Sequence, residues 1–192
     1  MMISEKERLL IKKAKEGDEG SFETLILSCK GKAYNIALRY VKNENDAMDI
    51  LQESFIKIFR HLDKFNEESK FETWVYRIVV NACNDFLRKN KNKYNQLSLL
   101  SKEDEEMEMD IPDNTPSPEE LLLKKEHGAY ILDCLEKIPI EHKKILILRD
   151  IKGFAYEDIS EILDCSIGTV KSRISRARNN LKEVYLKNNI KE

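Results

Sequence analysis

Residues 168–178, GTVKSRISRAR, carry four cations in eleven positions: Lys171, Arg173, Arg176 and Arg178. Ammonium and guanidinium groups donate charge-assisted hydrogen bonds to phosphate oxygens, so this stretch favours the binding of a phosphate backbone. The alternative is the ordinary solvated face of a surface helix. The elements that position the cations decide between the two interpretations.

The cations lie in an expected helix over residues 166–186, which follows a short expected helix over residues 155–163 and a brief turn. This layout predicts a helix-turn-helix. On a helical wheel one narrow apolar stripe faces the core, formed by Val170, Ile174, Ala177 and Leu181. The opposite face has short polar residues at its centre and cations at its edges, which is typical of a helix in the major groove of DNA.

The predicted contact set for duplex DNA covers the first turns of this helix. Ser166 as N-cap would leave the first-turn amides near the DNA backbone, where they help to hold a phosphate. The residues of this set are Ser166, Gly168, Thr169, Lys171, Ser172, Arg173, Ser175, Arg176 and Arg178.

Length and composition predict an all-α protein of one large or two small domains. The 192 residues are 35% charged and include only six glycines and four prolines, so long helices are expected. No apolar run approaches the ~18 residues of a membrane span. The N-terminus has no apolar signal core, and we therefore expect a cytoplasmic protein.

An acidic segment divides the chain. Residues 102–110, KEDEEMEMD, are followed closely by prolines, and a like-charge block with prolines predicts a flexible linker. We expect the linker over residues 96–117 and helical domains over residues 1–95 and 118–192. The second domain opens at Ser117 with a capping pattern. It should contain four helices, the first ending near residue 137 and the others near residues 141–151, 155–163 and 166–186.

The sequence offers no catalytic group. The four cysteines lie far apart, and the three histidines have no partners at metal-ligand spacing. No phosphate-cradling glycine loop and no nucleophile elbow occur. We therefore predict no enzyme activity, no metal, no cofactor and no small-molecule substrate, and we expect the cysteines to be buried reduced thiols.

Four helices are expected in the first domain. The first covers residues 4–15, the second begins at Asp18 or Ser21, and the third runs from Asn43 or Asn45 through residue 61. The second helix carries an apolar stripe at 3.6-residue spacing, which includes Cys29, Ala33, Ile36 and Ala37.

The fourth helix of the first domain, over residues 71–89, has two interpretations. Its outward side carries cations and amides flanked by Trp74 and Tyr76, a combination that suits a single nucleic-acid strand, whose bases stack on rings. The alternative, which the helix alone favours, makes both aromatic residues half-buried packing residues. The outward residues are Thr73, Arg77, Asn81, Asn84 and Arg88.

Three ordered blocks resemble a known family. They are DAMDILQESFIKIFR at residues 46–60, FETWVYRIVVN at residues 71–81, and RDIKGFAYEDI at residues 149–159 running into residues 168–178. In order and spacing they resemble bacterial RNA polymerase sigma factors of the extracytoplasmic-function (ECF) group of the sigma-70 family. The blocks span most of the chain, with a variable linker where the family has one.

The resemblance implies that domain 1–95 is sigma region 2 and domain 118–192 is sigma region 4. Region 2 would bind the clamp helices of core RNA polymerase through Asp49, Gln52, Glu53 and Ile56. It would also recognise and melt the −10 promoter element. The residues implied for that task are Lys64, Asn66, Ser69, Lys70, Trp74, Tyr76, Arg77, Asn81, Asn84 and Arg88. Region 4 would read the −35 element and contact the polymerase flap.

The resemblance also implies an anti-sigma factor as a partner, membrane-bound or soluble.

The net charge of −2 argues against strong DNA binding by the free chain, because non-specific affinity scales with the phosphates neutralised. We hypothesise that the acidic linker shields the basic helix in the free protein. The competing interpretation is a stand-alone helix-turn-helix regulator that binds duplex DNA without polymerase.

Overall fold

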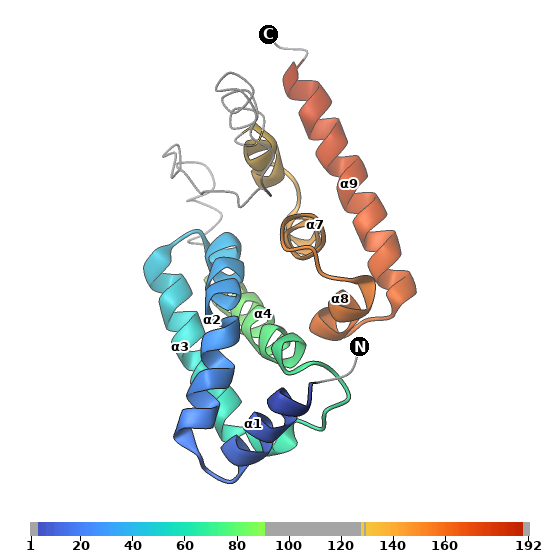
Figure 1. Ribbon diagram of the computed structural model, residues 1–192. Helices are drawn as coiled ribbons and strands as arrows, with labels where there is room; N and C mark the ends of the chain where they lie inside the picture. Colours follow the sequence, from blue (N-terminus) through green and yellow to red (C-terminus); the bar gives the residue numbers. More distant parts are fainter. Residues whose placement is uncertain (1–3, 91–127, 129, 190–192) are drawn as a thin grey trace, which may run out of the picture.

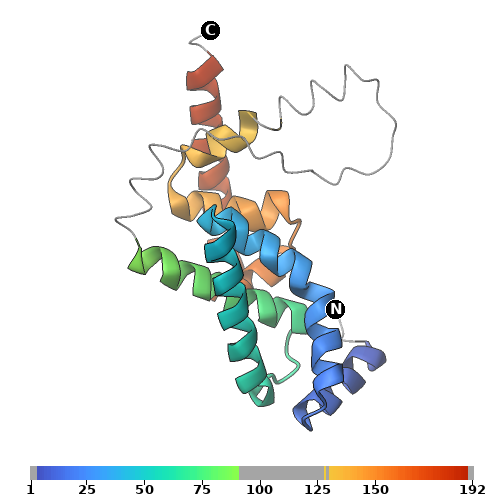
Figure 2. The same ribbon diagram turned by 90° about the vertical axis from the view of Figure 1, so that its left-hand side faces the viewer.

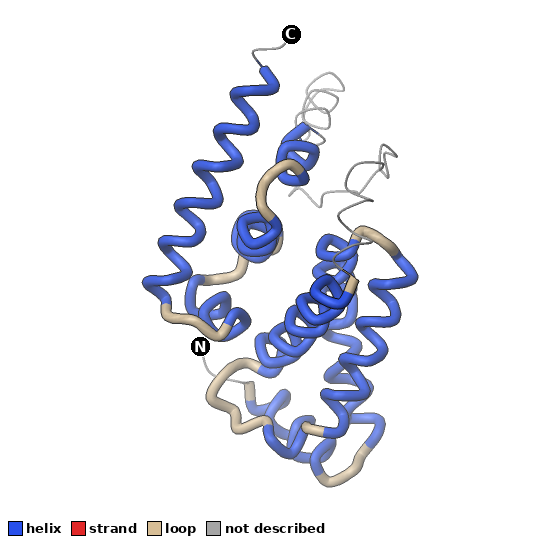
Figure 3. Tube along the Cα trace, turned by 180° about the vertical axis from the view of Figure 1, so that it is seen from behind, coloured by secondary structure: helices blue, strands red, loops and turns tan. Residues whose placement is uncertain are grey.

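The computed structural model of the protein describes residues 4–90, 128 and 130–189. Every regular element in these ranges is helical (Figure 3), in agreement with the predicted all-α class. Figure 1 shows an N-terminal group of helices beside a C-terminal group. The predicted linker over residues 96–117 and the helix start at Ser117 lie outside the described residues.

The N-terminal group contains α1 (Glu5–Lys15), α2 (Glu19–Val41), α3 (Glu44–Arg60) and α4 (Phe71–Lys89). The first three helices have side-chain N-caps, and for the second and third helices the sequence predicts Asp18 or Ser21 and Asn43 or Asn45 as the first residues. Ser4, Asp18 and Asn43 each accept a hydrogen bond from the amide three residues ahead, at 3.2, 2.8 and 3.0 Å. Each cap satisfies an amide that would have no partner within its helix.

The helices of this group pack around α2, which contacts α1, α3 and α4. The 3.6-residue stripe predicted for α2 is confirmed, because Cys29, Ala33, Ile36 and Ala37 are fully buried. Figures 1 and 2 together show α4 between the rest of this group and the C-terminal helices. One side of α4 therefore belongs to the bundle, and the other meets the second group.

The C-terminal group contains α7 (Ile140–Leu146), a π-helical turn η2 (Ile147–Ile151), α8 (Tyr156–Leu163) and α9 (Ile167–Asn189). The sequence predicts a single helix over residues 141–151, so the π turn is a correction. The hydrogen bond at the end of this turn spans five residues instead of four, because the Lys152 amide donates to the Ile147 carbonyl at 2.9 Å. Arg149 then donates to the Phe154 carbonyl at 2.7 Å, which fixes the chain reversal.

Two buried thiols give the N-terminal core a pH dependence. Burial raises the pKa of Cys29 and of Cys83 to about 12. In the unfolded chain a thiol loses its proton near pH 8.5. Between these values the folded state binds more protons than the unfolded state, so the free energy of unfolding falls as pH rises.

We therefore expect the free energy of unfolding to fall less between pH 8 and pH 11 in the variant C29A/C83A than in the unmodified protein. The measurement is urea unfolding followed by circular dichroism at each pH. The buried phenols of Tyr40 and Tyr76 remain in that variant and keep part of the slope, because burial also raises the pKa of each. The matched control is C165A, which removes a partly exposed thiol. An unchanged slope in C29A/C83A would contradict this account.

Candidate nucleic-acid and polymerase interfaces

The basic helix α9 has the two faces that the sequence predicts. Val170, Ile174 and Ala177 are buried against the C-terminal group, and the polar centre and its cations are exposed. The Ser166 cap is confirmed, because its hydroxyl accepts a hydrogen bond from the Thr169 amide at 3.2 Å. The exposed members of the predicted set are Ser166, Gly168, Lys171, Ser172, Arg173, Ser175, Arg176 and Arg178; Thr169 is partly buried.

The turn before α9 completes a helix-turn-helix. Asp164 ends α8 in the left-handed backbone conformation, with φ of +51°, and this sharp turn redirects the chain. The Ser160 hydroxyl donates to the Cys165 carbonyl at 2.5 Å and closes the turn. The predicted layout of short helix, turn and longer basic helix is therefore confirmed.

Arg178 differs from the other cations of the predicted set. Its guanidinium donates to both carboxylate oxygens of Asp150, from Nε at 3.2 Å and from Nη2 at 2.5 Å, so it ties α9 to the π turn. In the described part of the chain, Lys171 and Arg173 form no ion pair. Arg176 also lacks an ion pair there, but it donates to the Ser172 hydroxyl at 3.4 Å. Lys171 and Arg173 are therefore the cations on this face that no side-chain bond holds in the described chain.

The outer face of α4 is partly covered. Tyr76 is only 1% exposed and packs edge-to-face on Phe154, with ring centroids 5.3 Å apart. Thr73, 2% exposed, donates to the Asp158 carboxylate at 3.3 Å. Arg77 pairs with Asp164 at 3.1 Å. The expectation that Thr73 and Tyr76 lie on a free face is wrong in this structure, because α8 packs against α4.

Further contacts join the two groups at the side of α2. Lys32 places its ammonium 4.3 Å from the centroid of the Phe154 ring, and the Tyr40 hydroxyl donates to the Lys144 carbonyl at 3.5 Å. Glu136 accepts from Lys143 at 2.8 Å and also pairs with Lys42 of the N-terminal group. We call this whole set of contacts, with the α4–α8 contacts, the closed interface.

The remaining α4 residues are placed differently from one another. Trp74 is half-buried and packs on Phe65 and Phe71 at 5.3 and 5.9 Å between ring centroids, which supports the packing interpretation for this residue. Asn81 and Arg88 are exposed. Asn84 is half-buried, and its Oδ1 atom is buried without a hydrogen-bond partner in the described chain.

The loop before α4 presents its polar residues outward. Lys64 and Asn66 are exposed, Ser69 and Lys70 are partly buried, and Phe65 alone of residues 64–70 is fully buried. Phe65 anchors the loop by packing on Phe71 at 5.6 Å between ring centroids. The structure thus brings the loop and the N-terminal end of α4 together on one side of the bundle.

The four residues predicted to bind polymerase, Asp49, Gln52, Glu53 and Ile56, are all exposed on α3. The same helix also exposes two large apolar side chains that the sequence reasoning missed, Met48 at 53% and Phe59 at 50%. Their spacing from Gln52 and Ile56, four and three residues, is the signal that places them on this face. We call these six residues the α3 face; it combines apolar contact area with negative charge.

The described residues contain no group of three His, Cys, Asp or Glu side chains that could hold a metal ion. Cys29, Cys83 and Cys134 are buried as expected, and Cys165 is partly exposed. In the described ranges, no helix is both long and apolar enough to cross a membrane.

A helical bundle that accompanies a helix-turn-helix with an exposed basic face is typical of a DNA-binding protein. The model for sigma-70 region 2 matches residues 25–93, and the model for sigma-70 region 4 matches residues 128–181. The ECF RNA polymerase sigma-E factor of Haemophilus influenzae is 35% identical over 173 residues, which are 90% of this chain and 91% of that protein. The RNA polymerase sigma-H factor of Pseudomonas aeruginosa is 32% identical, over 93% of each chain.

The chain therefore belongs to the ECF group of the sigma-70 family. It is a sigma factor, not an enzyme, and it directs promoter recognition and transcription initiation by RNA polymerase. Two solved structures share the fold. They are CnrH in complex with the cytosolic domain of CnrY (TM-score 0.64, 21% identity, 93% of this chain and 96% of that one) and the sigma factor RpoE in complex with the anti-sigma factor NepR from Bartonella quintana (TM-score 0.61, 24% identity, 85% and 95%).

Proposed function

We propose that three surfaces divide the work of this sigma factor. The α3 face binds the clamp helices of core polymerase, the loop 64–70 with the outer face of α4 binds the melted −10 strand, and the exposed face of α9 reads the −35 duplex. The observation that carries the proposal is the free basic face of α9 within a complete helix-turn-helix.

For the −35 element, the division of labour on α9 follows from side-chain length. Lys171 and Arg173 reach phosphates and fix the register, and Ser172 and Ser175 are short enough to let the helix approach base edges. Arg178 acts from its fixed place beside Asp150 and supports the orientation of α9. In the assembled polymerase, region 4 also contacts the flap.

For the −10 element, the α4 residues supply phosphate and base contacts. Arg77, Asn81 and Arg88 lie on the side that remains at least partly open, together with Lys64 and Asn66 of the loop. Unpaired bases gain ~1–3 kcal/mol each by stacking on aromatic rings, and Tyr76 becomes available for this only when α8 leaves α4. Base stacking on Tyr76 therefore requires the closed interface to open.

For the polymerase, the α3 face joins two kinds of contact. Ile56, Met48 and Phe59 supply apolar area, and Asp49 and Glu53 supply charge that fixes orientation. An anti-sigma factor is a further proposed partner, because one of the similar solved structures is a sigma factor in complex with an anti-sigma factor. We place the protein in the cytoplasm, where core polymerase works.

The proposal is tested by run-off transcription with purified bacterial core polymerase on a library of promoter fragments. We expect start sites that depend on the added protein and that share a −10 and a −35 element. Start sites that appear equally without the protein would contradict the proposal.

The variant I56D tests the assignment of the α3 face. The new carboxylate lies in the apolar centre of the interface, where burying a charge without a partner is unfavourable, and it repels the neighbouring acidic side chains. We therefore expect the affinity for core polymerase to fall about 30-fold or more. Affinity is measured by competition for core polymerase with a labelled sigma factor. The control is L27D, which places the same carboxylate at an exposed leucine of α2. Equal losses in the two variants would contradict the assignment.

A further inference from the structure

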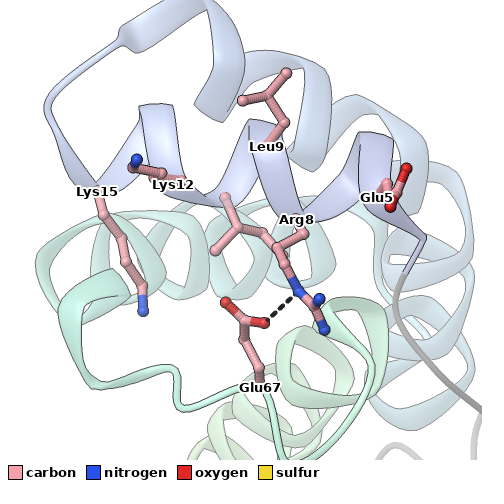
Figure 4. Close-up of a pocket in the computed structure, with 7 residues that line it drawn as sticks. Glu5, Arg8, Leu9, Lys12, Lys15 and Glu67 are labelled. Carbon is pink, nitrogen blue, oxygen red and sulfur yellow. Dashed lines mark hydrogen bonds and ion pairs between the residues drawn. The ribbon is translucent and has the colours of Figure 1, made fainter.

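The helix α1 lies directly against the loop 64–70, which the proposed function places at the −10 strand (Figure 4). Between them is an open groove of about 480 Å³, and both helix and loop line it. The match to sigma-70 region 2 begins at residue 25, so α1 precedes it. The residues along the groove are Glu5, Arg8, Leu9, Ile11, Lys12, Lys15 and Glu67.

Two cations of α1 hold the loop at two points. Lys15 donates from Nζ to the Phe65 carbonyl at 2.6 Å, and its ammonium lies 5.9 Å from the centroid of the Phe65 ring. Arg8 donates from Nε to the Glu67 carboxylate at 2.9 Å, the contact drawn in Figure 4. Lys15 therefore holds main chain, and Arg8 holds a side chain two residues further along.

The second anchor acts on a residue with an unusual backbone. Glu67 has a φ of +61°, in the left-handed region that residues other than glycine adopt at a cost. A tie to its carboxylate opposes the return of this residue to an ordinary conformation. The Arg8–Glu67 pair is largely exposed and adds little to global stability, so its effect is on the local shape of the loop.

The two anchors flank Asn66. This side chain is exposed, and its Oδ1 atom accepts a hydrogen bond from the Glu68 amide at 3.4 Å. With Phe65 and Glu67 both fixed, the position and direction of Asn66 are fixed as well. An amide held in this way offers a defined donor and acceptor pattern to an unpaired base.

We infer that Arg8 and Lys15 are positioning residues for promoter specificity. They do not contact DNA; they hold the loop in the one shape in which Asn66 faces the −10 base. This inference rests on the proposed role of residues 64–70. Its rival is direct binding of a DNA phosphate in the groove by the cations of α1.

The two mechanisms differ in what they do to a promoter library. A lost phosphate contact weakens all sequences alike and lowers the salt dependence of binding, because fewer counterions are released. A lost positioning contact changes the relative use of the four bases at the positions that the loop reads. The measurement is therefore transcription from a library that carries every base at each −10 position, at two salt concentrations.

At the −10 positions that the loop reads, we expect R8A/K15A to reduce the ratio of transcription between the best and the worst base by about fivefold. The base preference at −35 and the affinity for core polymerase should not change. The control is K12A, which removes a cation from the same groove; in the described chain Lys12 has no hydrogen bond to the loop (Figure 4). The charge swap R8E/E67R should recover the preference lost in R8E, because it restores the pair in reverse. Circular dichroism confirms the fold of each variant.

Three results would overturn the inference. A uniform loss across the library in R8A/K15A, with a lower salt dependence, would assign the cations to DNA phosphates. If the base preference is unchanged in R8A/K15A but changed in N66A, the loop contacts the −10 strand and α1 does not position it. An unchanged preference in N66A as well would overturn the proposed role of the loop itself.

Discussion

A chain whose two helical groups are covalently joined through positions 73 and 158 is expected to lose promoter-dependent transcription by at least about 100-fold. Thr73 lies on α4 and Asp158 on α8, and their side-chain oxygens are 3.3 Å apart in the closed interface. A crosslink there removes the open state from the population. Tyr76 then stays under Phe154, and α8 stays packed on α4.

The experiment uses the variant T73C/D158C in a C165A background, because Cys165 is partly exposed and would compete for the reagent. A thiol-cleavable bismaleimide joins the two positions, and run-off transcription is measured before and after reductive cleavage. The controls are the two single-cysteine variants treated with the same reagent. Full activity of the joined chain would show that the closed interface is compatible with initiation, and it would contradict the proposed use of the α4 face.

The second large effect is expected from reversing charge on the recognition face. Because Lys171 and Arg173 are the cations of the recognition face that form neither an ion pair nor a side-chain hydrogen bond in the described chain, K171E/R173E replaces two attractions to phosphate by two repulsions. We expect transcription from promoters that depend on a −35 element to fall about 100-fold. The slope of log affinity against log salt concentration should fall by the amount that corresponds to about two phosphate contacts.

The control for this effect is K182E/K187E, which makes the same change of charge at exposed positions nearer the C-terminal end of α9. It separates a general effect of net charge from loss of contacts at the recognition face. Comparable losses in the two variants would place the DNA elsewhere. Arg178 is unsuitable for this comparison, since its replacement would also free Asp150 in the π turn.

The local parts of this fold are predictable because short-range physics determines them. Asp18 and Asn43 cap helices through bonds to amides three residues away, and Val170 and Ile174 recur at helical spacing. The π turn was missed because one inserted residue barely disturbs an apolar pattern, and Ile145 to Leu148 are all buried. Periodicity alone does not reveal the change from four-residue to five-residue hydrogen bonding.

The closed interface was missed for a different reason. A helical wheel tells which residues of α4 face away from its own bundle, and it placed Thr73 and Arg77 there. The wheel does not tell what contacts these residues, because their side-chain donors bond equally well to a carboxylate such as that of Asp158 and to a nucleic acid. The partner residues lie more than 80 positions away along the chain. The α3 face likewise needed the family resemblance, because an exposed acidic helix has no distinctive periodicity of its own.

The ion pair between Arg77 and Asp164 has a thermodynamic consequence. Under the proposed role of Arg77, one guanidinium serves either region 4 or a promoter phosphate, so the two are mutually exclusive ligands of α4. The closed form is thus an intramolecular competitor, and the apparent dissociation constant for a −10 strand equals the intrinsic value divided by the open fraction. Any partner that holds the domains apart raises promoter affinity by the reciprocal of that fraction without making a single contact to DNA.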